Sequence, residues 1–273
     1  MKIKLISLFV VLTFSTQSFA SIVFQPEKKS HLYQTFGLFS EEGQTSIYNR
    51  GGSKYWGEIC SKITLFDVDS IWGRPQFILN AGVQASLHNQ GKEFLSETMD
   101  VRVGIAGLFT INHSTRLMVA VSHLSGHVLE DVPDKDLIPL NVGDETLQFR
   151  IIHDYERSFR FGGTLKYVLG TEGEIRRINA DQFFEWFPFT ERNSTQTSTP
   201  YVAVGVEENG FDKYVLTSHV QTGLFWGNHL DENHDEIIRV SLGGYSGLDP
   251  RQKYSHFKRT KAHFGYFGLA YEY

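Results

Sequence analysis

Two residues in the middle of the chain, His123 and Ser125, have the types and the spacing that could do chemistry. Residues i and i+2 of a β-strand project from the same face, so both side chains point the same way if this segment is extended. Their Cα atoms would then lie ~6–7 Å apart, and the histidine side chain can help to bring the two groups within hydrogen-bond reach. A serine beside a histidine suits nucleophilic catalysis, which also needs a third group to orient the histidine. Together with His127, the pair could instead form polar groups that cap a strand at a membrane interface, or a ligand or metal site.

The segment around this pair alternates between two faces with a period of two. The face that holds His123 and Ser125 also holds Leu117, Val119 and Val121. A large apolar face next to a mixed face is typical of a barrel wall with lipid on one side. On that interpretation the serine lies at the end of its strand, where it could meet the ester of a phospholipid directly.

The same alternation recurs along the chain and predicts about twelve strands. The expected segments are 32–39, 54–68, 77–89, 98–111, 115–127, 145–155, 159–169, 180–188, 200–207, 213–226, 236–246 and 261–273. The chain is 14% aromatic and has 25 Gly but is only 41% hydrophobic, which fits apolar residues spread over every second strand position. We therefore predict an all-β fold, a single antiparallel transmembrane β-barrel of about 12 strands with a filled or wet lumen.

Both ends of the chain predict export. Met1 to Ala20 combine two lysines, a ten-residue apolar stretch and a small-residue cleavage site, which indicates a signal peptide that is removed to leave 21–273 as the barrel domain. The chain ends on Tyr273 with apolar residues two, four and six positions earlier. Bacterial outer-membrane barrels commonly end this way, and the barrel assembly machinery reads such an end. We expect the outer membrane of a Gram-negative bacterium, with a soluble sandwich as the alternative.

Charge and cysteine content exclude other classes of protein. A formal net charge of −5 argues against nucleic-acid binding, which usually needs a basic patch. The single cysteine, Cys60, can form neither an intrachain disulfide nor a cysteine-based metal cluster. No phosphate-loop pattern occurs, and we expect no cofactor.

The central and C-terminal segments resemble a family of Gram-negative outer-membrane proteins known only as a domain of unknown function. The matching pieces are GVQASL (82–87), DVRVGIAGLF (100–109), SHLSGHVLED (122–131), and the stretch from YSGLDPRQKY (245–254) to the end. No activity is established for that family, so the resemblance implies location and fold more than chemistry.

Two short segments also look similar to outer-membrane phospholipase A, a twelve-stranded barrel. They are His123, Ser125 and Gly126, and the Tyr245-Ser246-Gly247 strand. The resemblance implies that His123 is a general base and Ser125 a nucleophile for acyl transfer, with calcium as a possible cofactor.

This chain departs from the phospholipase pattern at the group that orients the histidine. That enzyme uses an asparagine twelve residues after the serine, where this chain has Leu137. Asn141 is off register, and Asp131 or Asp134 could take the role only by conjecture. Gly126 also follows the serine directly, one position earlier than in the enzyme. The orienting residue stays unassigned.

Three further segments could bind something or mark the membrane boundary. Residues 229–236 crowd two histidines with carboxylates and could hold a divalent cation. Residues 249–261 are basic and could contact lipopolysaccharide headgroups. The aromatic run FFEWFPF (183–189) suits an interface girdle.

The sequence therefore predicts an outer-membrane barrel of uncharacterised role. A non-enzymatic envelope or lipid- and ligand-binding barrel is the first hypothesis, with outer-membrane lipids and lipopolysaccharide as partners. A phospholipase A-like acyl hydrolase with His123 and Ser125 is the alternative. A narrow porin is the second alternative, because Phe264 and Tyr266 are expected to point inward.

Overall fold

The computed structural model describes twelve segments of the chain. They are residues 22–24, 44–52, 54–68, 75–90, 93–128, 142–156, 158–171, 177–188, 198–210, 214–227, 237–249 and 261–272. The strands are β1 (Ile22–Phe24), β2 (Gln44–Asn49), β3 (Lys54–Val68), β4 (Gln76–Gln90), β5 (Glu93–Asn112), β6 (Thr115–Val128), β7 (Val142–Tyr155), β8 (Phe159–Thr171), β9 (Ile178–Trp186), β10 (Thr199–Gly210), β11 (Tyr214–Trp226), β12 (Ile237–Leu248) and β13 (Lys261–Glu272). In these segments, no helix has the length and apolar character needed to cross a membrane.

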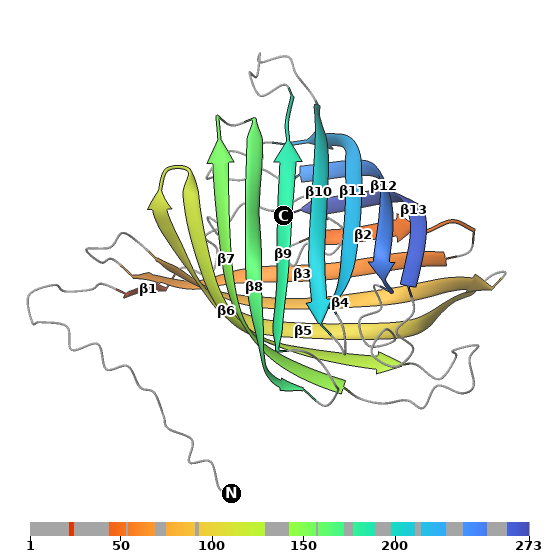
Figure 1. Cartoon of the computed structure of the whole chain (residues 1–273), viewed down its shortest axis with the longest axis horizontal. Helices are drawn as coiled ribbons and strands as arrows, with labels where there is room; N and C mark the ends of the chain where they lie inside the picture. The colour runs from red at the N-terminus through yellow and green to blue at the C-terminus, as the bar shows by residue number, and fades with distance from the viewer. Residues whose placement is uncertain are drawn as a thin grey trace, which may run out of the picture.

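Twelve of these strands close into one antiparallel barrel (Figure 1). Each strand from β3 to β12 pairs with the strand before it and the strand after it, and β13 pairs with β2 to close the ring. The three-residue β1 pairs with the end of β3. The predicted all-β antiparallel barrel of twelve strands is therefore confirmed.

The first strand of the barrel lies at a different place in the sequence from the one that the alternation predicts. The predicted strand at 32–39 is outside the described residues, and β2 occupies Gln44–Asn49, which we expected to be part of a connection. Within this six-residue strand, Ile47 is the one large aliphatic side chain that faces outward. So short a strand carries too little alternation to be recognised. The other predicted segments overlap β3 to β13.

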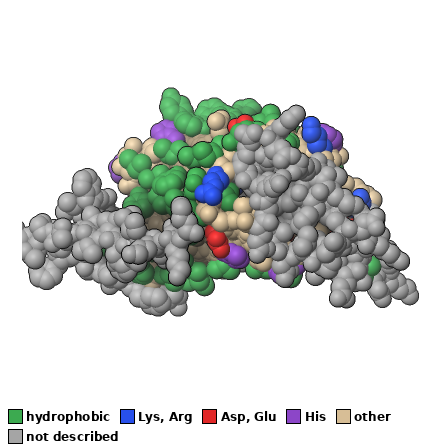
Figure 2. All heavy atoms as spheres, turned by 60° about the horizontal axis from the view of Figure 1, so that its bottom comes forward, with side chains coloured by type: hydrophobic (Ala, Val, Ile, Leu, Met, Phe, Trp, Pro, Cys, Tyr) green, Lys and Arg blue, Asp and Glu red, His purple; other side chains and the backbone are tan. Residues whose placement is uncertain are grey.

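The two faces of the wall have opposite chemistry. Large apolar side chains point outward, and Ile59, Leu216 and Leu242 are each at least 60% exposed. Hydrophobic side chains cover much of the described surface in Figure 2, with few charged groups among them. Charged and polar groups point inward instead, and Arg160 and Arg239 are 1% and 0% exposed. A soluble protein distributes these residue types the other way round.

Side chains fill the lumen. One apolar cluster joins β4 to β7, and a second joins β10 to β12 with Phe187. An aromatic cluster of Tyr48, Trp56, Tyr245 and Tyr266 lies between β2, β3, β12 and β13. These residues are as buried as the core of a soluble protein, so the interior is packed rather than open.

Buried ion pairs complete the packing of the lumen. Arg160 contacts Asp154 at 2.8 Å and Glu185 at 3.2 Å, and Arg116 contacts the other oxygen of Asp154. Pairing of this kind is what makes buried charges tolerable. These ion pairs therefore connect neighbouring strands on the inward side of the wall.

Outward aromatic side chains mark one end of the barrel. We call the end at which β6 finishes the β6 end, and the opposite end the β7 end. One large aromatic side chain faces outward near the last residue of each of β7, β9, β11 and β13; these are Tyr155, Trp186, Trp226 and Tyr271. The predicted aromatic run 183–189 contributes only alternate residues to this girdle, because Phe187 turns inward and is 1% exposed.

Candidate functional site

His123 and Ser125 lie on the outer wall near the β6 end. Both follow Val121 on the outward face of β6, and the His123 side chain is 52% exposed. The alternate residues of this strand are buried on its inward face; they are Met118, Ala120, Ser122 and Leu124. The two residues therefore share the outward side of the barrel, as the alternation predicts.

The residue that contacts His123 is Glu145 of β7. The two residues are paired directly across the strands, and Nδ1 of His123 is 3.7 Å from Oε1 of Glu145. The Glu145 carboxylate lies over Gly170 of β8, where a Cβ atom would sit only 2.3 Å from Oε2. The absence of a side chain at Gly170 thus makes room for the carboxylate on the wall.

The other edge of the His123 ring faces the row that holds Ser125. Gly143 is the cross-strand partner of Ser125. A Cβ atom on Gly143 would lie 3.2 Å from Cε1 and 3.9 Å from Nε2 of His123. The ring therefore lies between the Glu145 carboxylate and Gly143, with Nδ1 on the carboxylate side and Cε1 nearest to Gly143.

The hydroxyl of Ser125 points to the histidine on its other side. Oγ of Ser125 and Nε2 of His127 are 3.3 Å apart and share a hydrogen bond. His123 and Ser125 face the same side of the wall but have different hydrogen-bond partners. Ser125 thus stands between two histidines on one face, and its observed hydrogen-bond partner is His127.

The carboxylate beside His123 that sequence reasoning missed is Glu145. It lies beyond the long connection 129–141, and only the pairing of β6 with β7 brings it to His123. The residues weighed for orienting His123, Asp131, Asp134, Leu137 and Asn141, lie outside the described residues. No local pattern distinguishes Glu145 from the other carboxylates.

A second serine–histidine pair lies on the outer wall at the same end of the barrel. Ser246 of β12 and His263 of β13 are cross-strand partners, and Oγ and Nδ1 are 2.9 Å apart. Ser246 belongs to the Tyr245-Ser246-Gly247 strand that carries the phospholipase resemblance. The exposed Lys261 precedes His263 by two residues and shares its face. Sequence reasoning singled out the serine but not its histidine.

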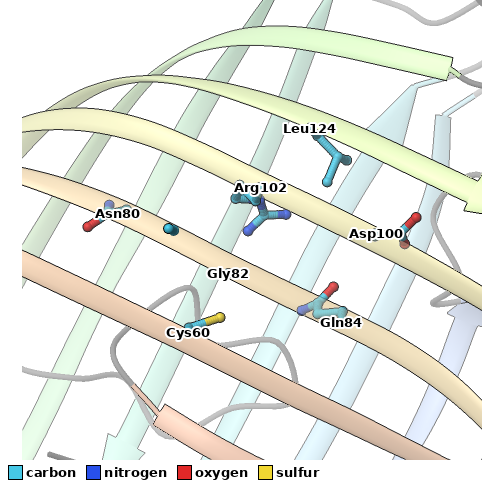
Figure 3. Close-up of a pocket in the computed structure, with 8 residues that line it drawn as sticks. Cys60, Asn80, Gly82, Gln84, Asp100, Arg102 and Leu124 are labelled. Carbon is cyan, nitrogen blue, oxygen red and sulfur yellow. The ribbon is translucent and has the colours of Figure 1, made fainter.

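A small cavity opens on the inward side of β3 to β6. Figure 3 shows Cys60, Gln84, Asp100, Arg102 and Leu124 around one space. Its volume is about 20 Å³, which is too small for a lipid or a sugar.

The buried carboxylate of Glu58 is saturated by neighbouring donors beside this cavity. Nε2 of Gln84 donates to it at 2.9 Å, Sγ of Cys60 at 3.3 Å and Oγ of Ser46 at 3.4 Å. These contacts tie β2, β3 and β4 together. The group is therefore part of the packing of the wall, and the Cys60 thiol is buried within it.

Metal binding finds no support in the described part of the chain. No group of three or more His, Cys, Asp or Glu side chains there could hold a metal ion. The predicted cation cluster at 229–236 lies outside the described residues, as does most of the basic segment 249–261.

Comparison with protein-family models finds no match for this chain, and comparison with curated proteins finds none either. Location and role therefore rest on the fold and the site. A closed β-barrel of twelve strands fits an outer-membrane barrel protein.

Proposed function

We propose that this protein is an outer-membrane barrel that hydrolyses acyl esters of the surrounding lipids at a site on its outer wall. The observation that carries the proposal is the position of His123, whose ring lies between the Glu145 carboxylate and the row of Ser125. The site faces outward among apolar side chains, so a lipid ester can reach it without leaving the bilayer. The aromatic girdle at the β7 end supports the membrane placement.

The reaction follows from the three side chains. Ser125 Oγ attacks the carbonyl carbon of the ester, and its proton passes to Nε2 of His123. Glu145 holds the ring and stabilises its positive charge. The tetrahedral intermediate collapses, and the departing alkoxide takes the proton from His123 to leave as a lysolipid. Water, deprotonated by His123, then cleaves the acyl-serine bond and releases a fatty acid and the original serine.

Calcium, which the phospholipase resemblance implies, does not fit the described site. Ca²⁺ takes 6–8 oxygen ligands, whereas Glu145 and Ser125 are the oxygen-bearing side chains that the described part of the site offers. We therefore route no step through calcium.

The packed lumen supports a site on the wall rather than a pore. Arg239, Gln221 and Phe225 are each 0% exposed inside the barrel. A solute would have to displace these side chains and the buried ion pairs around Arg160. A narrow porin is therefore the least favoured of the three hypotheses.

A non-enzymatic lipid-binding barrel is the second candidate. The observation that favours it is the 3.3 Å hydrogen bond to His127, which turns the Ser125 hydroxyl away from His123. In this case the polar groups on β6 would hold a headgroup, and no bond would be broken.

The test is hydrolysis of phospholipid by the full chain refolded in detergent. Fatty-acid release is measured with and without calcium for the unaltered chain, for Ser125→Ala, and for Ser61→Ala as a matched control on the outward face of β3. We expect Ser125→Ala to lose at least ~10³-fold of the rate and Ser61→Ala to keep it. Equal rates for Ser125→Ala and the unaltered chain, or no hydrolysis by either, would overturn the proposal; lipid binding without hydrolysis would leave the second candidate.

A further inference from the structure

We propose that the outer wall at the β6 end of β12 and β13 binds the phosphate of an anionic membrane lipid through Lys261, His263 and Ser246. The proposal depends on the membrane placement of the barrel but not on chemistry at Ser125. It concerns a different part of the wall, with different neighbours.

The three residues form one polar group on an otherwise apolar face. Lys261 and His263 project from the same side of β13, and Ser246 lies opposite His263 on β12. Farther along the same face, the wall becomes apolar at Leu242 and Phe267, which are 60% and 51% exposed. A polar group at the end of strands whose middle faces lipid lies at headgroup depth.

The charge of Lys261 has no protein counterpart among the described residues. Lys166, inside the barrel, contacts Asp181 at 3.6 Å and Glu207 at 3.7 Å. Lys261 is exposed and makes no such contact in the described part of the chain. An unpaired ammonium group at a membrane surface attracts anionic lipid headgroups.

The bond between His263 and Ser246 prepares the serine to donate. In the tautomer with the proton on Nδ1, His263 donates to Oγ of Ser246 across the observed 2.9 Å. The hydroxyl proton of Ser246 is then left to donate to a phosphate oxygen beside the Lys261 ammonium group. Charge-assisted bonds of this kind are the strong ones in anion recognition.

Farther from the β6 end than Lys261, His263 and Ser246, the outward face has space for an acyl chain. Gly244 and Gly265 are cross-strand partners on the outward face. A Cβ atom on Gly244 would meet nothing closer than 3.8 Å, and one on Gly265 would meet nothing closer than 3.6 Å. At Gly205 on the inward face, by contrast, the His219 ring already occupies that position. A lipid whose phosphate is bound at Lys261 can therefore lay a chain against the backbone between Leu242 and Phe267.

The experiment measures binding of phosphatidylglycerol to the full chain refolded in detergent, by native mass spectrometry. Folding of every variant is checked by the mobility shift of unheated barrels in gel electrophoresis. We expect Lys261→Gln and His263→Ala each to weaken binding about ten-fold. Lys54→Gln, an exposed lysine at the same end on β3, is the matched control and should bind normally.

Two further probes identify the occupant. Inorganic phosphate should bind at least ~100-fold more weakly than phosphatidylglycerol, because it has no chain to bury. Uncharged diacylglycerol should show no dependence on Lys261. Undiminished phosphatidylglycerol binding by Lys261→Gln, or equal binding of inorganic phosphate and the lipid, would overturn the proposal. Neither result depends on whether Ser125 hydrolyses an ester.

Discussion

Two serine–histidine groups lie on the outer wall at the same end of the barrel, and they differ in the charge beside the histidine. On β6, His123 has the Glu145 carboxylate at 3.7 Å. On β13, His263 has Lys261 two residues away on the same face and no carboxylate partner among the described residues. A carboxylate stabilises an imidazole that takes up a proton during catalysis. At His263 the neighbouring charge is instead the positive ammonium group of Lys261. The same pair of residue types is therefore suited to acyl chemistry in one place and to anion binding in the other.

The largest expected effect separates the two histidines that flank Ser125. If His123 is the base, His123→Gln should lower the hydrolysis rate at least ~10³-fold, whereas His127→Gln should lower it less than about ten-fold. Fatty-acid release from phospholipid in detergent measures both. The reverse order would make His127 the base and remove Glu145 from the mechanism.

The next effect tests the carboxylate that distinguishes the two groups. Glu145→Gln should lower kcat about 10²-fold with little change in KM, because it removes the charge that stabilises the imidazolium but leaves the lipid contacts in place. Glu145→Asp should restore part of kcat. A purely structural role would instead change the two parameters together, and the aspartate would not restore activity.

A smaller effect is expected from the glycine under the ring. Gly143→Ala places a methyl group 3.2 Å from Cε1 of His123, so the ring must shift, and we expect about a ten-fold loss of rate. Gly57→Ala on β3 is the matched control, since its methyl group would make an ordinary 3.7 Å contact with Leu87. Unchanged activity of Gly143→Ala would show that the position of the ring is unimportant.

The smallest effect is a difference in salt dependence. Raising the ionic strength from about 0.1 M to 1 M shortens the screening length from ~10 Å to ~3 Å. Phosphatidylglycerol binding should weaken about five-fold, since it depends on the exposed Lys261. Hydrolysis of an uncharged ester at Ser125 should change little. Equal salt dependence of both processes would erase the proposed distinction.

Local alternation is sufficient to predict the barrel from the sequence. Each strand places apolar side chains on the outward face, so the period of two is readable in any segment of ten or more residues. The outward direction of His123 and Ser125 and the inward direction of Tyr266 followed from that period alone. The prediction failed at β2, where six residues carry too few alternations. In the aromatic run 183–189, alternate residues point to opposite faces of the wall. The run taken as one cluster does not reveal this division.

The partners across strands were decided only by the tertiary structure. Glu145 meets His123, and His263 meets Ser246, because of the register in which neighbouring strands pair. That register is a property of the closed ring of strands, and a one-residue slip would move each partner to the opposite face. The sequence by itself thus determined which residues face outward from the barrel. Only the closed barrel decided that His123 received the carboxylate of Glu145 and His263 the hydroxyl of Ser246, whereas Lys261 shares the face of His263 by the alternation alone.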